Sequence, residues 1–221
     1  MPHQTTNTID CSKRVADAMI YFDIKGFTRY IDSFQTDEHY LHLAACWQDL
    51  RDELLCANSP HGRGIYVANR IGDACLLFCF DVPSAQLLCY VTGDLQRLFE
   101  RFLAHLAEGP AGGPTPRHVK LSIIGGGCPY YQTGRVPREI VGDHSWSLLD
   151  FFSPTINKLA RIDALPEADD FVFLCNAWLR DELVGGGLAK ASTFIDLGLR
   201  PLKGFSAAEW IFGYMPNPPG N

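Results

Sequence analysis

The sequence predicts an α+β domain in which a single sheet carries helices on one face. Apolar runs at 16–23, 65–71, 74–80 and 119–124 have the length and composition of buried strands. Helical stretches separate the first strand from the second and the third from the fourth. This is the βαββαβ order of ferredoxin-like domains, and apolar segments near the C-terminus are expected to add further strands.

Two helices are predicted between the first and second strands. Gly26 makes a turn after the first strand, and Thr28 is expected to cap a short helix that runs to Phe34. Residues 36–56 place apolar side chains at helical spacing, which is typical of a helix that packs on a sheet.

The second and third strands, 65–71 and 74–80, are expected to form a hairpin. Gly72-Asp73 between them is a typical two-residue hairpin turn. A helix from 83 to 106 follows. The Gly- and Pro-rich segment 109–116 then forms a loop, because it suits neither a helix nor a strand.

The glycines at 125–127 and Pro129 are expected to end the strand at 119–124. The rest of the chain is predicted to form helices at 154–163 and 176–183 and strands at 171–175, 193–199 and 208–214.

Length and composition are those of one globular domain, and the charge balance argues against some partners. The chain has 221 residues, a formal net charge of 19 − 25 = −6 and 47% hydrophobic residues. We expect the domain to span 16–215, with 1–15 as a disordered lead-in and 216–221 as a tail. No apolar run is long enough to cross a membrane, and no basic run suits a nucleic-acid backbone. The polar first residues lack the apolar stretch of a secretory signal.

Eight cysteines without a CxxC pair indicate reduced thiols in a cytoplasmic protein rather than a zinc ribbon. Most lie in apolar segments, where a free cysteine packs as a small hydrophobic residue. His39 and His42 have helical spacing. Without a second ligand pair, however, they are better interpreted as a solvated helix face than as a metal site.

Two carboxylates at strand ends are the first candidates for chemistry. Asp23 closes the first strand before the Gly26 turn, and Asp73 lies at the tip of the hairpin. Each alone is a common turn aspartate. Two carboxylates on neighbouring strands, however, are what two-metal phosphoryl transfer needs, because ions about 3.5–4 Å apart must share ligands.

Asn157 and Arg161 form a second candidate pair. They are four residues apart in the predicted helix 154–163, so they share one helix face. Such a pair can orient a ribose and reach a phosphate, although the solvated face of an amphipathic helix has the same pattern.

These motifs together resemble the catalytic domain of the class III nucleotidyl cyclases, the family of adenylate and guanylate cyclases. Met19–Thr28 resembles the strand and turn around that family's first metal aspartate, and Ile71–Ala74 resembles its second-aspartate hairpin. Asp150–Arg161 is similar to the family's segment ending in N-x-x-x-R, and Leu202-Lys203-Gly204-Phe205 to its late L-K-G turn. The motifs occur in the family's order and span residues 19–214. The resemblance implies the ferredoxin-like core of a cyclase domain with extra C-terminal strands.

The resemblance implies a ligand role for each matching residue. Asp23 and Asp73 would bind two Mg²⁺ or Mn²⁺ ions, with the Ile24 carbonyl as a further ligand. A second group would contact the phosphates: Lys25, Gly26, Phe27 and Thr28 through their backbone, and Lys120, which lies where many relatives have an Arg.

The resemblance also implies a dimer. Asn157 would orient the ribose, and Arg161 would stabilise charge on the α-phosphoryl group. Family members work as head-to-tail dimers in which one subunit supplies the metals and the other the Asn/Arg pair. A homodimer with two composite active sites is therefore implied.

Three residues bear on which base is bound. By resemblance, Asn69 stands where adenylate cyclases have Lys and guanylate cyclases have Glu, while Asp150 matches the Asp of adenylate cyclases. This pair fits neither purine rule, and an Asn, which both donates and accepts, suits a pyrimidine edge. Tyr21 shares a strand face with Asp23 and would narrow the pocket against a purine, although a core tyrosine has the same pattern. Phe205 replaces a Lys that many relatives use on the phosphates, which puts that contact in doubt.

The sequence thus predicts an enzyme that makes a 3′,5′-cyclic mononucleotide and pyrophosphate from a ribonucleoside triphosphate, with UTP or CTP favoured over ATP. A short cyclase without a sensor domain also resembles the pyrimidine cyclases of bacterial Pycsar anti-phage systems, whose product a separate effector reads. The alternatives are an adenylate cyclase with a relaxed base pocket and an inactive nucleotide-binding module. The presence of both aspartates with Asn157 and Arg161 argues against the inactive module.

Overall fold

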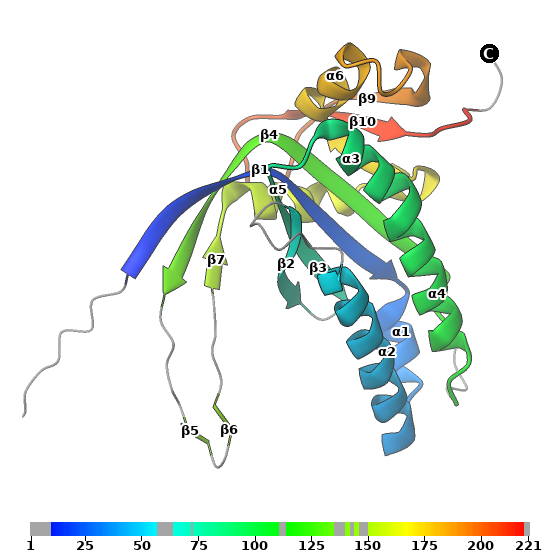
Figure 1. Ribbon diagram of the computed structural model, residues 1–221. Helices are drawn as coiled ribbons and strands as arrows, with labels where there is room; N and C mark the ends of the chain where they lie inside the picture. Colours follow the sequence, from blue (N-terminus) through cyan, green and yellow to red (C-terminus); the bar gives the residue numbers. More distant parts are fainter. Residues whose placement is uncertain are drawn as a thin grey trace, which may run out of the picture.

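A long sheet organises the chain, as Figure 1 shows. The structure is a computed structural model, and it describes residues 10–56, 64–71, 73–110, 114–134, 140–141, 144–145 and 150–218. Its eight-stranded sheet has the order β2-β3-β1-β4-β8-β10-β9, with β7 paired to β4, and β5 and β6 form a separate two-stranded ribbon. Among the described pairings, that of β4 with β8 is parallel and the others are antiparallel.

The strands are β1 (Asp10–Lys25), β2 (Gly64–Ile71), β3 (Ala74–Phe80), β4 (His118–Gly134), β5 (Ile140–Val141), β6 (His144–Ser145), β7 (Asp150–Phe152), β8 (Phe173–Asn176), β9 (Phe194–Arg200) and β10 (Glu209–Tyr214). The helices are α1 (Phe27–Asp32), α2 (Asp37–Cys56), α3 (Ser84–Cys89), α4 (Leu95–Ala107), α5 (Pro154–Asp163) and α6 (Ala177–Gly185). A π-helical turn, Tyr90–Asp94, joins α3 to α4, so the single helix predicted at 83–106 is nearly continuous. None of these helices has the length and apolar character needed to cross a membrane.

The predicted α+β class and most of the predicted elements are confirmed. The hairpin strands, α2, α5 and the C-terminal strands begin and end within two residues of their predicted bounds. Of the six cysteines whose side chains are described, five are buried, consistent with packing as small apolar residues.

The strand β1 begins six residues before the predicted strand. Asp10 pairs with Gly134 and Arg14 with Tyr130, so residues 10–15 are strand and not part of a disordered lead-in. The sequence pattern misses this extension because its residues are polar, and their order comes from hydrogen bonds to β4.

The strand β4 likewise continues through the glycines that were expected to end it. Gly126 and Gly127 have φ values of 99° and 78°, in the region that favours glycine, and they form a bulge in β4, because only one residue of β1 lies between Ala16 and Ala18 opposite them. A Cβ at position 126 would lie 2.7 Å from the Trp178 ring. The glycines therefore bend the strand and admit this ring.

Helices cover both faces of the sheet, contrary to the expectation of one covered face. Ile20, Phe22 and Ile24 of β1 pack in the larger core cluster, which includes residues of α1, α2, α4 and α6. Met19 and, at its margin, Tyr21 pack in a second cluster with Leu159 and Ile162 of α5. Figure 1 shows α5 on the opposite side of the sheet from α2 and α4. Successive side chains of β1 point to opposite faces of the sheet and therefore contribute alternately to the two core clusters.

Two expectations about the first helices are also wrong. Thr28 does not cap α1, because the helix begins at Phe27 and its N-cap is Gly26, which makes no side-chain hydrogen bond. His39 does not lie on a solvated face. It is buried; its Nδ1 lies 3.1 Å from the Thr36 amide nitrogen and its Nε2 lies 3.1 Å from the Pro110 carbonyl oxygen.

A substitution at Phe22 measures how much the packing of β1 against the helices contributes to stability. Its side chain is 0% exposed, and its ring centroid lies 4.7 Å from that of Phe99. We expect Phe22→Ala to lower the free energy of unfolding by about 3–5 kcal/mol, because it removes a buried ring and leaves a cavity. Leu41→Ala on α2, where the side chain is 69% exposed, is the control and should change it by less than ~0.5 kcal/mol. Urea denaturation measures both, and equal effects of the two variants would contradict this account of the core.

Candidate active site

Two carboxylates from neighbouring strands meet at one end of the sheet. Asp23 pairs across the sheet with Ala74, the residue that follows Asp73. The Ile24 amide donates to the Asp73 carbonyl oxygen at 3.3 Å, which attaches the hairpin turn to the end of β1. Burial, and next the neighbouring Asp73, raise the pKa of the Asp23 carboxyl above its usual value. The structure therefore brings the two predicted metal ligands together.

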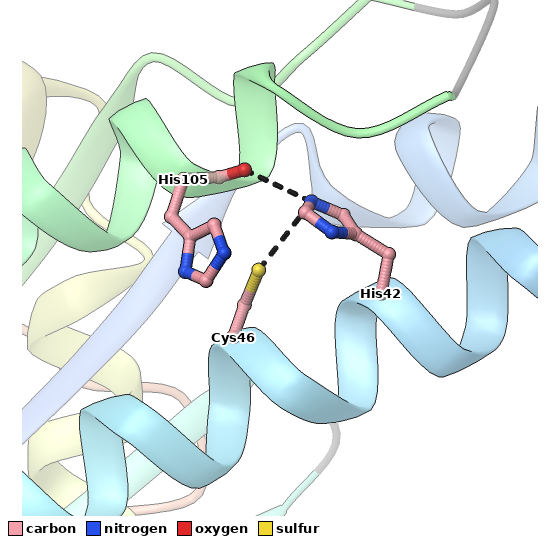
Figure 2. Close-up of side chains that lie close together, drawn as sticks. All are labelled: His42, Cys46 and His105. Carbon is pink, nitrogen blue, oxygen red and sulfur yellow. Dashed lines mark hydrogen bonds between the residues drawn. The ribbon is translucent and has the colours of Figure 1, made fainter.

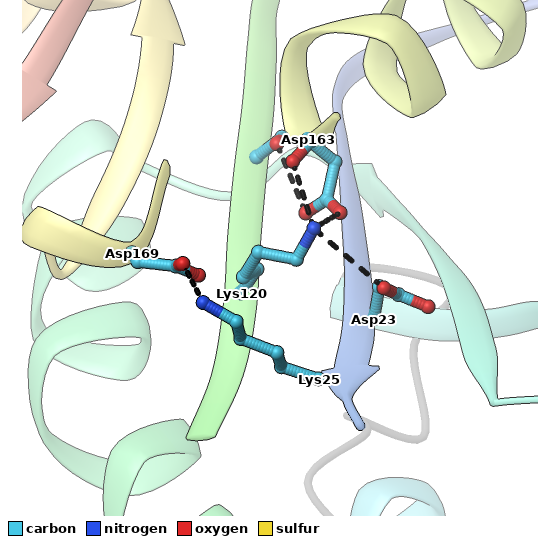
Figure 3. Close-up of polar contacts among 6 residues, drawn as sticks. Asp23, Lys25, Lys120, Asp163 and Asp169 are labelled. Carbon is cyan, nitrogen blue, oxygen red and sulfur yellow. Dashed lines mark hydrogen bonds and ion pairs between the residues drawn. The ribbon is translucent and has the colours of Figure 1, made fainter. Parts of the chain in front are cut away.

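A third carboxylate, that of Asp163, lies beside this pair and was missed in the sequence analysis. Figure 3 shows Lys120 between Asp23 and Asp163. The Lys120 ammonium is 3.7 Å from the Asp23 carboxylate and 3.1 Å from that of Asp163, and it donates to the Asp163 carbonyl oxygen at 3.0 Å. Ser122 donates to Asp163 Oδ1 at 3.4 Å. Lys120 thus holds the end of α5 against β1 and β4.

A signal for Asp163 was present in the sequence. It is four residues after Leu159 and directly follows Ile162, so it belongs to the apolar face of the amphipathic helix. A carboxylate on such a face is buried only with a partner, and here the partners come from β4. Burial, only partly offset by Lys120, raises the pKa of Asp163 to about 6.

Tyr21 lies on the same face of β1 as Asp23 and is half-buried. Burial, followed by the charges of Asp23, Asp163 and Asp73, raises the pKa of Tyr21 to about 12. The phenol therefore keeps its proton at neutral pH and can donate a hydrogen bond toward this group of carboxylates.

The turn from β1 into α1 is open. Gly26 has φ 82°, and a Cβ built there would meet nothing within 4 Å. Phe27 is buried in the core, whereas Thr28 is exposed. Lys25 forms an ion pair with Asp169, which Figure 3 also shows.

A cavity of about 310 Å³ lies beside this turn. Three of its lining residues are cationic: Lys25, Arg29 and Arg117. Cationic side chains beside an open, glycine-containing turn are suited to an anionic ligand.

Asn157 and Arg161 line a different cavity, of about 580 Å³, together with Phe152, Lys203 and Phe205. Both are exposed on one face of α5, while Asp163 at the end of the same helix turns toward β1 and β4. Neither Asp23 nor Asp73 lines this cavity. Within one chain, the structure therefore does not bring the Asn/Arg pair together with the two aspartates.

The side chains of Asn69 and Asp150 lie outside the described part of the structure, as does Gly72. The backbone pairing nevertheless places Asn69 opposite Leu76, which on its other side pairs with Tyr21. Asn69 of β2, Leu76 of β3 and Tyr21 of β1 thus lie next to one another across the sheet. Asp150 begins β7 and pairs with Thr133 of β4.

The donor set at the end of β1 fits divalent cations such as Mg²⁺ or Mn²⁺. It offers the carboxylates of Asp23 and Asp73 and nearby backbone carbonyl oxygens, which are hard oxygen ligands. Burial, followed by the charge of Asp73, raises the pKa of Asp23, and a cation bound between the two carboxylates would favour the ionised form of Asp23.

Comparison with solved structures shows that this is the fold of adenylyl and guanylyl cyclase catalytic domains. The adenylyl cyclase CyaB from P. aeruginosa matches with a TM-score of 0.61 and 14% identity, over 94% of this chain and 97% of that chain. The guanylyl cyclase Cya2 matches with a TM-score of 0.60 and 13% identity, over 95% and 96%. The guanylate cyclase domain of RhGC from Catenaria anguillulae in complex with GTP matches with a TM-score of 0.56 and 14% identity, over 92% and 99%. No protein-family model and no curated protein matches the sequence.

The raised pKa of Asp163 predicts a pH dependence of stability. A carboxyl whose pKa is near 6 when folded and 3.8 when unfolded contributes stability at low pH that is lost as the pH rises through about 6. Relative to Asp163→Asn, the wild-type free energy of unfolding should therefore fall by about 2 kcal/mol between pH 4 and pH 7.

Urea denaturation in EDTA over this pH range measures the difference. Asp170→Asn, which changes an exposed carboxylate a short distance along the chain, is the control and should track the wild type. A difference between wild type and Asp163→Asn that does not change with pH would show that Asp163 has an ordinary pKa.

Proposed function

We propose that this protein is a nucleotidyl cyclase, which converts a ribonucleoside triphosphate to a 3′,5′-cyclic mononucleotide and pyrophosphate. The observation that carries the proposal is the meeting of Asp23 and Asp73 at the end of β1, beside the open Gly26 turn. The fold shared with adenylyl and guanylyl cyclase domains supports it. Two of those relatives act on different purine nucleotides, so the fold alone does not select the base.

The carboxylates of Asp23 and Asp73, with the Ile24 carbonyl, would hold two Mg²⁺ or Mn²⁺ ions. Bound there, the ions would lower the pKa of the ribose 3′-hydroxyl and neutralise charge on the phosphates. Lys120 and Asp163 would set the position of Asp23 through the ion pairs described above. Lys120 would thereby serve as a positioning residue, and any phosphate contact it makes would require release from Asp163.

The phosphates would lie along the Gly26 turn and contact the backbone of Lys25, Gly26, Phe27 and Thr28, while Arg29 and Arg117, which line the cavity beside the turn, would supply positive charge. The 3′-oxygen attacks the α-phosphorus as the bond to the β-phosphate oxygen breaks. The 3′-hydroxyl proton leaves to solvent, and pyrophosphate carries away the electron pair of the broken bond. Positioning and electrostatics account for catalysis without an acid–base side chain.

A head-to-tail homodimer would complete the site. Asn157 and Arg161 face their own cavity, separate from the aspartates of the same chain. In a dimer, that cavity would face the partner's aspartates, where Asn157 orients the ribose and Arg161 stabilises the α-phosphoryl group. Two composite sites would result.

The favoured substrate is a pyrimidine nucleotide, UTP or CTP. The half-buried Tyr21 would narrow the space beside Asp23, and Asn69 pairs with the same residue of β3, Leu76, as Tyr21 does. An Asn with an Asp at position 150 suits a pyrimidine edge better than it suits adenine or guanine. A cytoplasmic cyclase of this kind would signal to a separate cyclic-nucleotide effector, as in bacterial anti-phage defence.

The composite site is tested by mixing inactive variants. Asp73→Ala and Arg161→Ala should each lower turnover by on the order of a thousand-fold, because each removes charge stabilisation of the transferring group. A mixed dimer holds one site with both changes and one with neither. If subunits exchange statistically, half of the dimers are mixed and each of these has one intact site out of two. Mixing should therefore restore roughly a quarter of the wild-type rate.

Mixing Asp73→Ala with Asp23→Ala is the control, because both changes then fall in the same half of every site and no intact site forms. Thermal melting should show that each variant is folded. Activity that stays absent after proven subunit exchange would mean that each site lies within one chain, and wild-type turnover by either single variant would overturn the two-metal assignment.

The base is tested by initial rates with each of the four triphosphates and Mn²⁺. UTP or CTP should exceed ATP and GTP, since a site that pairs with one base edge rejects another by up to ~10⁴-fold, whereas shape alone gives ~10–200-fold. Tyr21→Ala should admit purines, and Asn69→Lys should shift selectivity toward ATP by creating an adenylate-type Lys/Asp pair.

Tyr40→Ala, which changes an exposed tyrosine on α2, is the control and should leave the selectivity unchanged. A clear preference of the wild type for ATP would favour the adenylate cyclase alternative. Turnover of no triphosphate, with nucleotide still bound, would favour the inactive module.

A further inference from the structure

A second group of potential metal ligands lies between α2 and α4, in the helical layer on one face of the sheet. His42 and Cys46 are one helical turn apart on α2, and His105 comes from the last turn of α4. One ligand atom from each of these residues lies within 4.8 Å of the others. Figure 2 shows the three side chains directed toward one another. The sequence could not reveal this group, because 59 residues separate Cys46 from His105.

The distances match those of a tetrahedral zinc centre. Zinc–nitrogen bonds of about 2.0–2.1 Å and zinc–sulfur bonds of about 2.3 Å place tetrahedral nitrogen and sulfur ligands roughly 3.5 Å apart. The Cys46 sulfur lies 3.5 Å from His42 Nε2. Small rotations of the His105 side chain, which is 38% exposed, would bring its ring to the same separation.

Neighbouring groups already orient both rings. Asp49, one turn after Cys46 on α2, has its carboxylate 3.5 Å from His105 Nδ1. Nε2 is therefore the nitrogen left to bind a metal, in the carboxylate–histidine–metal arrangement common to zinc sites. The ring of His42 packs on Gly109, where a Cβ would lie 2.3 Å from its Cδ2. A side chain at position 109 would displace that ring.

Metal binding would not leave the His105 carbonyl oxygen without a partner. His42 Nε2 now lies 2.9 Å from the His105 carbonyl oxygen and would leave it to bind a metal. That oxygen also accepts from the Glu108 amide at 3.2 Å and would keep this bond. The exchange replaces one hydrogen bond with a metal–nitrogen bond, and the last turn of α4 stays capped.

The site has an entrance. A cavity of about 230 Å³ lined by Cys46, Asp49, Arg101 and His105 gives access to the otherwise buried sulfur.

We propose that His42, Cys46 and His105 bind one Zn²⁺ ion that joins α2 to α4, with Asp49 orienting His105 and a water as the fourth ligand. Two imidazoles and a thiolate select a borderline metal such as zinc over Mg²⁺ or Mn²⁺, which prefer oxygen ligands. The site is independent of the cyclase proposal, because it shares no residue with the group around Asp23 and Asp73.

The experiment uses Co²⁺, a spectroscopic substitute for zinc, on protein stripped with EDTA. A thiolate–cobalt bond gives a charge-transfer absorption band that carboxylate sites cannot give, so metal at Asp23 and Asp73 does not interfere. We expect one equivalent of Co²⁺ to produce the band and Zn²⁺ to remove it. Zn²⁺ at a hundred times its dissociation constant should also raise the melting temperature by roughly 5 °C or more.

Matched variants assign the ligands. Cys46→Ser should abolish the band and the thermal shift, while Cys89→Ser, which changes an exposed cysteine on α3, should keep both. His105→Gln and Asp49→Asn alter exposed or partly exposed side chains and keep the fold testable if Cys46→Ser does not fold. Asp49→Asn should weaken affinity by ~10–100-fold, and His105→Gln, which removes a ligand, should weaken it at least as much.

Absence of the band in the wild type, or a band that persists in Cys46→Ser, would overturn the proposal. So would an unchanged affinity in His105→Gln. Cyclase activity is not a readout in any arm, so failure of the metal site and failure of the proposed function are distinguishable.

Discussion

The pairing of β1 with a strand on each side is the constraint on which the candidate site depends. Asp23 faces Ala74 of β3 in one register and Lys120 of β4 in the other, so a single position on β1 collects groups from both neighbours. A slip of one residue in either register would turn Asp23 to the opposite face of the sheet. The buried alternation of Phe22 and Ile24 against the helices prevents that slip.

Carboxylates outnumber cationic groups in the cluster of Asp23, Asp73, Lys120 and Asp163 at the end of β1. Asp23 and Asp163 both contact Lys120, Asp73 lies beside Asp23, and partial burial strengthens the interactions among these groups. Lys120 keeps α5 docked on the sheet but cannot neutralise three carboxylates. An excess of negative charge in a partly buried site is a property of structures that receive cations, and it accords with the chemistry proposed for the two aspartates.

The helix α5 divides the candidate catalytic groups into two sets. Its buried face carries Asp163 to the carboxylates, and its exposed face presents Asn157 and Arg161 to a separate cavity. The 3.6-residue period of one helix therefore separates the two sets within a chain, which is why the site proposed above requires a second copy. On the other face of the sheet, the packing of α2 on α4 gathers His42, Cys46 and His105, whose chemistry differs from the oxygen ligands at Asp23.

The sequence by itself determined the α+β class, most of the helix and strand bounds, and the placement of Asp23 and Asp73 at neighbouring strand ends, because these follow from apolar periodicity and turn residues. It did not determine that residues 10–15 pair with β4, that β4 bends through Gly126 and Gly127, or that α5 covers the opposite face. Nor did it reveal the contacts of Lys120 with Asp163 or of Cys46 with His42 beside His105. The spacing of apolar residues along the sequence indicates which side chains are buried. Which distant segment buries them, and which polar groups then meet, is decided only by tertiary packing.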